Sequence, residues 1–183
     1  HGGLPNKIIE VDPNMVEMFL GRIEDPPNPR MDGSDMDSGF RAIMFTDLAG
    51  FTALTVQLGD ARAMDLLRRH NEIVRGELAQ HEGREVKHTG DGMMASFTSA
   101  SEAVAAAVAI QRRFQAHNYE SPQEQLNLRV GATVGEPVEE HGDLFGASVQ
   151  LASRLCNLAE PGQVLVDDAL AGALPSGKIA LSD

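Results

Sequence analysis

The sequence has 183 residues, a length that supports the core of one compact domain. Its formal net charge of −12 at pH 7 argues against general nucleic-acid binding, because an acidic chain repels phosphate backbones. The longest apolar stretch, residues 103–110, is too short to span a bilayer. The single cysteine, Cys156, excludes an internal disulfide and indicates a reducing, cytoplasmic compartment; we expect it to be a small buried residue late in a helix.

The first 38 residues differ in composition from the rest. Residues 12–20 predict a short capped helix, and residues 25–38 are rich in Pro, Asp, Gly and Ser, which is typical of a linker. The sequence opens on His1 and shows no secretory leader. We therefore expect residues 1–38 to be the tail of an upstream module, joined flexibly to a main domain of residues 39–183, with no membrane segment in either.

From residue 40 the hydrophobic pattern predicts short strands alternating with helices. The first half is expected to contain a buried strand at 40–45, a turn at 46–52 leading into a helix, a long helix that Asp60 caps and Gly83 ends, and a β-hairpin of 84–88 and 93–97. An alanine-rich helix then runs from Ser99 to about 117, followed by a strand at 127–134 and a strand or continuation at 136–140. The last expected elements are a helix at 147–158, a strand at 163–166 and a short helix from Asp167. In the long helix, Met64, Leu67, Val74 and Leu78 share one face. The order β-α-β-β-α-β predicts an α+β sandwich of the ferredoxin-like type.

Two acidic residues stand at special places in this order. Asp47 lies at the end of the first strand, and Asp91 lies at the tip of the hairpin. In a split β-α-β-β-α-β sheet these strands are neighbours, so both carboxylates can reach one point, where a cation such as Mg²⁺ would relieve their repulsion. Read alone, Asp47 could instead be a helix cap and Asp91 an ordinary turn residue. The residues that follow Asp47, from Leu48 to Thr52, bring a glycine and a helix N-terminus that can bind phosphate.

Several motifs in this order resemble the class III adenylyl and guanylyl cyclase catalytic domains. The similarity is carried by residues 45–52 and 87–92, which resemble the two metal motifs, and by residues 129–131, 135–136, 142–146 and 149–155. It covers residues 40 to 174, and several motifs in the expected order are far more specific than any one. The short segment between Gly135 and Gly146 is similar to that of the short-arm bacterial subgroup.

The resemblance implies a role for individual residues. Asp47, Asp91 and the carbonyl of Leu48 match the ligands of two metal ions, Mg²⁺ or Mn²⁺. Lys87 and Asp143 match the pair that reads the purine, and Arg154 matches the arginine that stabilises charge on the transferring phosphate. The loop expected to contact the substrate consists of Leu48, Ala49, Gly50, Phe51 and Thr52. Without the resemblance, Lys87, Asp143 and Arg154 would be read as a solvated strand residue, a turn residue and an exposed helix residue.

Two positions depart from the family pattern. Gln150 stands where the family has an Asn that orients the ribose, and its amide sits on a stem one methylene longer. Family members also carry a late Lys that contacts the triphosphate, but the sequence ends at Asp183 before such a strand, and Lys178 lies too early to be assigned. Gln150 lowers the expected rate more than it changes the expected reaction; for the late Lys, either the sequence is truncated or the tail is dispensable.

The resemblance therefore predicts an adenylate cyclase that converts ATP to 3′,5′-cyclic AMP and pyrophosphate in a head-to-tail homodimer with two composite sites. One alternative is a guanylyl cyclase, which Lys87 and Asp143 disfavour. Another is a nucleotide-binding regulatory module that no longer turns over, which Gln150 and the missing late Lys favour and the presence of Asp47, Asp91 and Arg154 disfavours. A diguanylate cyclase is more distant, because the Gly-Gly-Asp/Glu-Glu-Phe turn is missing. No zinc site is predicted, since the histidines at 70, 81 and 88 are expected on helix surfaces and a strand without a third ligand.

Overall fold

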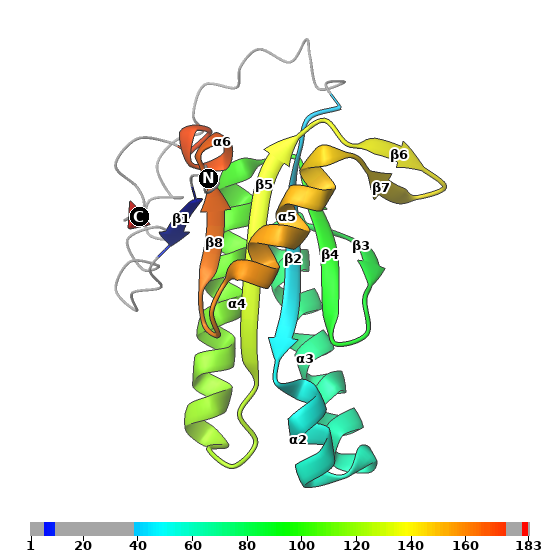
Figure 1. Cartoon of the computed structure of the whole chain (residues 1–183), viewed down its shortest axis with the longest axis vertical. Helices are drawn as coiled ribbons and strands as arrows, with labels where there is room; N and C mark the ends of the chain where they lie inside the picture. Colours follow the sequence, from blue (N-terminus) through cyan, green and yellow to red (C-terminus); the bar gives the residue numbers. More distant parts are fainter. Residues whose placement is uncertain (1–5, 10–38, 175–180, 183) are drawn as a thin grey trace.

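The computed structural model describes residues 6–9, 39–174 and 181–182. Its main sheet has seven strands in the order β3-β4-β2-β5-β8-β1-β9. Their bounds are β1 Asn6–Ile9, β2 Arg41–Ala49, β3 Arg84–His88, β4 Gly92–Phe97, β5 Asn127–Gly135, β8 Val164–Asp167 and β9 Leu181–Ser182. A separate two-stranded arm, β6 Val138–Glu140 and β7 Asp143–Phe145, projects from one end of the sheet (Figure 1).

The central strands confirm the predicted ferredoxin-like βαββαβ order. Strands β3, β4, β2 and β5 are joined by antiparallel pairings, so the first strand of the motif lies between the third and the fourth. Strand β8 then pairs parallel to β5, which requires a crossover connection. Helix α5 (Ala147–Leu158) supplies that crossover. Strand β2 extends to Ala49, beyond the predicted end at residue 45, because its last residues pair with the start of β5.

Helices cover the two faces of this sheet unequally. Helices α3 (Asp60–Gln80) and α4 (Ala100–Glu120) cover one face, and α5 crosses the other (Figure 1). The side chains of β2 alternate accordingly: Met44 and Leu48 belong to the large core under α3 and α4, whereas Ile43 belongs to the smaller core under α5. The remaining helices are α2 (Phe51–Leu58), which follows Gly50 and ends at Gly59, and α6 (Asp168–Gly172).

The core-facing stripe of α3 differs from the predicted one. Its buried residues are Ala63, Leu66, His70, Ile73, Val74, Glu77 and Leu78. Met64, expected inside, is 49% exposed, and His70, expected on the surface, is fully buried with its ring 5.7 Å from that of Phe114. His81 is also buried, and its Nδ1 lies 2.9 Å from a carboxylate oxygen of Glu102. The apolar residues of α3 are spread too widely around the helix for periodicity alone to fix which side faces the sheet.

The N-terminal strand is part of the main sheet. Residues Asn6–Ile9 pair antiparallel with β8, and Ile9 is buried in the main core. These four residues therefore belong to the same sheet as residues 39–174, although we expected them in the tail of a separate module. The predicted helix at 12–20, the linker at 25–38 and Lys178 lie outside the described residues. None of the helices that the structure describes is long and apolar enough to cross a membrane.

Candidate active site

Asp47 and Asp91 lie side by side where β2 meets the β3–β4 hairpin. Asp47 pairs in register with Gly92, the residue after Asp91, and the Leu48 amide donates a hydrogen bond of 3.2 Å to the Asp91 carbonyl. The backbones approach so closely that a Cβ at Gly92 would stand 2.1 Å from the Thr46 carbonyl oxygen. The prediction that the two aspartates come from neighbouring central strands is confirmed.

The electrostatics of this pair favour a cation. Burial raises the pKa of Asp91 above its ordinary value, and the nearby carboxylate of Asp47 raises it further. Oxygen donors of this kind are those that Mg²⁺ and Mn²⁺ prefer, and Mg²⁺ completes its shell with water and phosphate oxygens. Among the described residues no group of three or more His, Cys, Asp or Glu side chains could hold a metal.

Arg129 on β5 contacts Asp47 from the opposite side. The two residues are cross-strand partners, and the Arg129 guanidinium donates a hydrogen bond to the Asp47 carboxylate. Its other amino group donates to the Asn157 carbonyl of α5 at 3.3 Å. Arg129 lies in one of the motifs that resemble the cyclase domains, but no role was predicted for it. The only signal would have been the register of β2 against β5, which the hydrophobic pattern did not fix to the residue.

A small cavity opens beside Asp47 on the α5 side of the sheet. Its volume is about 250 Å³. Its lining residues are Phe45, Thr46, Asp47, Thr89, Ser153, Cys156 and Asn157. Cys156 is buried there as predicted, and burial raises the pKa of its thiol to about 12, so the thiol stays protonated and is a poor nucleophile.

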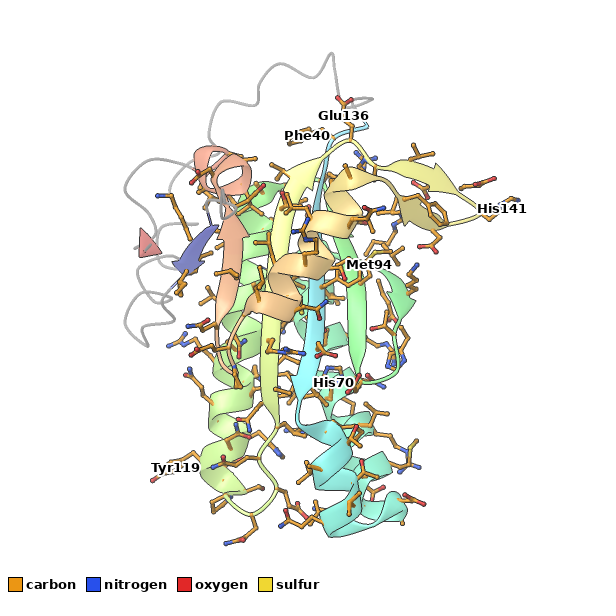
Figure 2. All side chains as sticks on the ribbon, viewed as in Figure 1. Phe40, His70, Met94, Tyr119, Glu136 and His141 are labelled. Carbon is orange, nitrogen blue, oxygen red and sulfur yellow. The ribbon has the colours of Figure 1, made fainter. Side chains whose placement is uncertain are left out.

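Lys87 and Asp143 form a second group at the arm. The Lys87 ammonium donates to Asp143 Oδ2 at 2.7 Å, and the Leu144 amide donates to Oδ1 at 2.8 Å. The hydrogen bond from Lys87 lowers the pKa of Asp143 below its ordinary value. A second ion pair, Arg84 to Glu139 at 3.0 Å, also ties β3 to the arm, whose tip carries His141 (Figure 2). Strand β3 and the arm thus present a donor and an acceptor together in one place.

Gln150 and Arg154 stand one helical turn apart on α5. Both are exposed, whereas Ala152, Leu155 and Cys156 form the buried side of the helix. Neither of the two lines the cavity beside Asp47. One chain therefore assembles the two aspartates with Arg129, and Lys87 with Asp143, but it leaves Gln150 and Arg154 facing outward.

Comparison with known proteins identifies this arrangement. The family model described as adenylate and guanylate cyclase catalytic domain matches residues 38–182. The chain belongs to this cyclase family. A putative adenylate cyclase 3 of Rhizobium meliloti is 35% identical over 130 residues, which are 70% of this chain and 22% of that protein. An adenylate cyclase of Streptomyces coelicolor is 34% identical over 143 residues, 78% of this chain and 36% of that protein. The cyclase domain thus spans about a fifth to a third of the length of these curated relatives.

Solved structures agree with the fold of the cyclase domain. An adenylate/guanylate cyclase/hydrolase from Silicibacter pomeroyi has a TM-score of 0.63 at 36% identity, over 73% of this chain and 78% of that one. An adenylate cyclase from Trypanosoma brucei in its monomeric state has a TM-score of 0.68 at 22% identity, over 80% and 81%. At 22% identity, the Trypanosoma brucei structure supports the fold of this domain and not its activity.

The expected substrate loop of the cyclase domain runs from the end of β2 into α2. Leu48 is buried beneath it, and Gly50, with φ of 72°, turns the chain into α2. Thr52 is exposed in the first turn. Because β2 continues to Ala49 and α2 begins at Phe51, only Gly50 lies between them. The turn predicted at residues 46–52 is therefore much shorter than expected, although it leads to a helix N-terminus as predicted.

We expect Asp91→Asn to raise the melting temperature of the metal-free cyclase domain at pH 7.5. A carboxyl whose folded pKa is raised binds its proton more tightly when folded, so its ionised form opposes folding above the unfolded pKa of about 4. The asparagine carries no charge and removes this cost. Calorimetry in EDTA should show the gain, and the gain should shrink as the pH falls toward 4. A variant that melts below the wild type at pH 7.5 would mean that the Asp91 carboxylate stabilises the hairpin.

Proposed function

We propose that the cyclase domain converts ATP to 3′,5′-cyclic AMP and pyrophosphate. The observation that carries the choice of ATP is the Lys87–Asp143 pair, whose Nζ and Oδ2 atoms are 2.7 Å apart. Adenine offers a ring-nitrogen acceptor and an exocyclic amine donor, which complement an ammonium and a carboxylate. Guanine has a carbonyl where adenine has the amine, so the carboxylate would face a second acceptor, and such a mismatch is costly when buried.

Asp47 and Asp91 would hold the divalent metal ions, together with the Leu48 carbonyl. When bound, two Mg²⁺ or Mn²⁺ ions would make the ribose 3′-hydroxyl more acidic and neutralise the leaving pyrophosphate. The two aspartates would bind and orient these metal ions, and Arg129 balances the charge of Asp47. Arg154, as a planar cation with several donors, is suited to stabilise charge that develops on the α-phosphate.

We further propose that the domain acts as a homodimer, in which each active site takes residues from both protomers. The face that carries α5 and the arm exposes apolar side chains, with Val138 at 65%, Phe145 at 47% and Leu158 at 60%, and such exposed residues are suited to an interface. Gln150 and Arg154 are also exposed, on α5. In this arrangement Arg154 and Lys87 of one protomer serve the aspartates of the other. We place the domain in the cytoplasm, regulated by a covalently linked upstream module.

Product analysis tests the reaction directly. Purified protein is incubated with ATP or GTP, in Mg²⁺ or Mn²⁺, and the products are separated by chromatography. We expect cyclic AMP from ATP and little cyclic GMP from GTP. Equal or preferred use of GTP would make the domain a guanylyl cyclase, and no product with either nucleotide and either metal would favour the regulatory module.

We expect Gln150→Asn to raise kcat about tenfold with little change in the KM for ATP, because one positioned hydrogen bond is worth a few kcal/mol at most. The shorter stem would move the amide to where the family has it, near the ribose, whereas the purine is held by Lys87 and Asp143. A group that matters more in the transition state than in the ground state changes turnover rather than binding. Steady-state kinetics check this, with Gln115→Asn at an exposed position of α4 as the control. A slower variant would show that the pocket suits Gln.

A further inference from the structure

Asn71 on α3 joins two histidines that approach it from different elements. Its Oδ1 lies 2.9 Å from Nδ1 of His70 and 3.0 Å from Nε2 of His88. His70 precedes it on α3, and His88 ends β3, immediately before the turn that carries Asp91. A carboxamide oxygen accepts but cannot donate, so both ring nitrogens must carry their protons toward it.

His70 fixes the orientation of this amide from inside the core. It is fully buried, beside Phe114, and Figure 2 labels it near the end of β2 that leads into α2. Burial lowers the pKa of His70 to about 4, so the ring is neutral at pH 7 and carries one N–H. The bond to Asn71 assigns that proton to Nδ1, and the surrounding core holds the ring in one position.

His88 carries the connection to the metal hairpin. It pairs with Met93 across the hairpin, and the turn between them is closed by the Thr89 amide donating to the Gly92 carbonyl at 3.0 Å. On its other side the turn is bonded to β2 through the Leu48 amide and the Asp91 carbonyl at 3.2 Å. The hairpin tip is therefore attached to the sheet on one side and to α3, through Asn71, on the other.

The need for a firm attachment follows from the charges at the tip. Two carboxylates of like charge, Asp47 and Asp91, lie side by side where β2 pairs with the hairpin, so they repel each other when no metal is bound. We propose that Asn71 is a positioning residue of the metal site, which holds His88 and hence the hairpin so that Asp91 stays opposite Asp47. This inference rests on the proposed metal-dependent function of the two aspartates.

The test measures metal binding without turnover. Mn²⁺ is titrated into the dimeric domain in the absence of nucleotide, and free Mn²⁺ is followed by electron paramagnetic resonance. We expect Asn71→Leu to weaken Mn²⁺ binding about tenfold, as removal of an outer-shell partner commonly does. In kinetics the metal concentration needed for half-maximal rate should rise, while the KM for ATP at saturating metal changes little.

A second pair of variants guards against simple misfolding. His88 is exposed, so its replacement leaves the core intact. His88→Ala should weaken Mn²⁺ binding as Asn71→Leu does, whereas His88→Gln, which keeps an N–H donor, should recover most of the wild-type affinity. A loss that is equal in the two His88 variants would overturn the proposal.

Arg75→Gln provides the matched control. Arg75 also joins α3 to β3, through two hydrogen bonds to Glu85 of 2.6 and 2.9 Å at the far end of the strand. We expect this variant to bind Mn²⁺ as the wild type does. If Arg75→Gln weakens binding as much as Asn71→Leu, or if Asn71→Leu binds normally, the inference is wrong while the proposed function stands. A wild-type domain that binds no Mn²⁺ overturns both.

Discussion

Replacing Asp47 or Asp91 by alanine is expected to abolish turnover while the fold persists. Either change leaves a single carboxylate at the site, and groups that hold catalytic metals contribute several kcal/mol, which corresponds to a rate loss of about a thousandfold or more. Neither side chain belongs to the core, since both aspartates are only partly buried at the end of the sheet. Removing Asp91 also relieves the repulsion between them, whereas removing Asp47 takes from Arg129 its carboxylate partner, so the Asp47 variant should melt below the Asp91 variant.

The measurement combines rate and fold. Cyclic AMP production is assayed with Mg²⁺ and with Mn²⁺, and circular dichroism and thermal melting report the fold. Asp168→Ala, an exposed aspartate of α6, serves as the control and should keep the wild-type rate. A variant of Asp47 or Asp91 that retains more than about a tenth of that rate would contradict the two-metal role.

Mixing two inactive variants is expected to restore activity. In the proposed dimer each site takes Asp47 and Asp91 from one protomer and Arg154 from the other. A mixed dimer of Asp47→Ala and Arg154→Ala then has one site with every wild-type residue. With random exchange half of the dimers are mixed and half of their sites are intact, so recovery should reach about a quarter of the wild-type rate.

The same logic supplies a control that should stay inactive. Asp47→Ala mixed with Asp91→Ala restores no site, because both residues must come from one protomer. Subunit exchange is verified with differently tagged chains. If exchange is complete and the first mixture stays inactive, the sites are not shared across the interface; if the second mixture recovers, the two aspartates do not act together.

Features that depend on local chemistry could be predicted from the sequence. Ser99 caps α4, accepting a hydrogen bond from the Glu102 amide at 3.3 Å, and the Asp167 side chain caps α6. Helix α5 covers the predicted residues 147–158. The glycine-rich turn placed Asp91 at a hairpin tip, because that turn admits few other conformations. Once the strand order was inferred, the meeting of Asp91 with Asp47 followed.

Features that depend on how distant elements meet could not be predicted. The contact of Arg129 with Asp47 requires the register of β2 against β5, and no pattern within either strand fixes that register to one residue. The burial of His70 depends on which side of α3 turns toward the sheet. A polar residue inside is invisible to a hydrophobic pattern, and here its ring is held by contacts with α4 and Asn71.

The close approach of β2 and β4 at Gly92 limits how this site can evolve. Any side chain there would place its first carbon 2.1 Å from the Thr46 carbonyl oxygen, and backbone atoms cannot yield as a flexible side chain does. The position next to Asp91 is therefore closed to all other residue types, even conservative ones such as alanine. Variation in this family of sites must come from residues farther out, on α5 and the arm, where side chains such as Gln150 are exposed in the single chain.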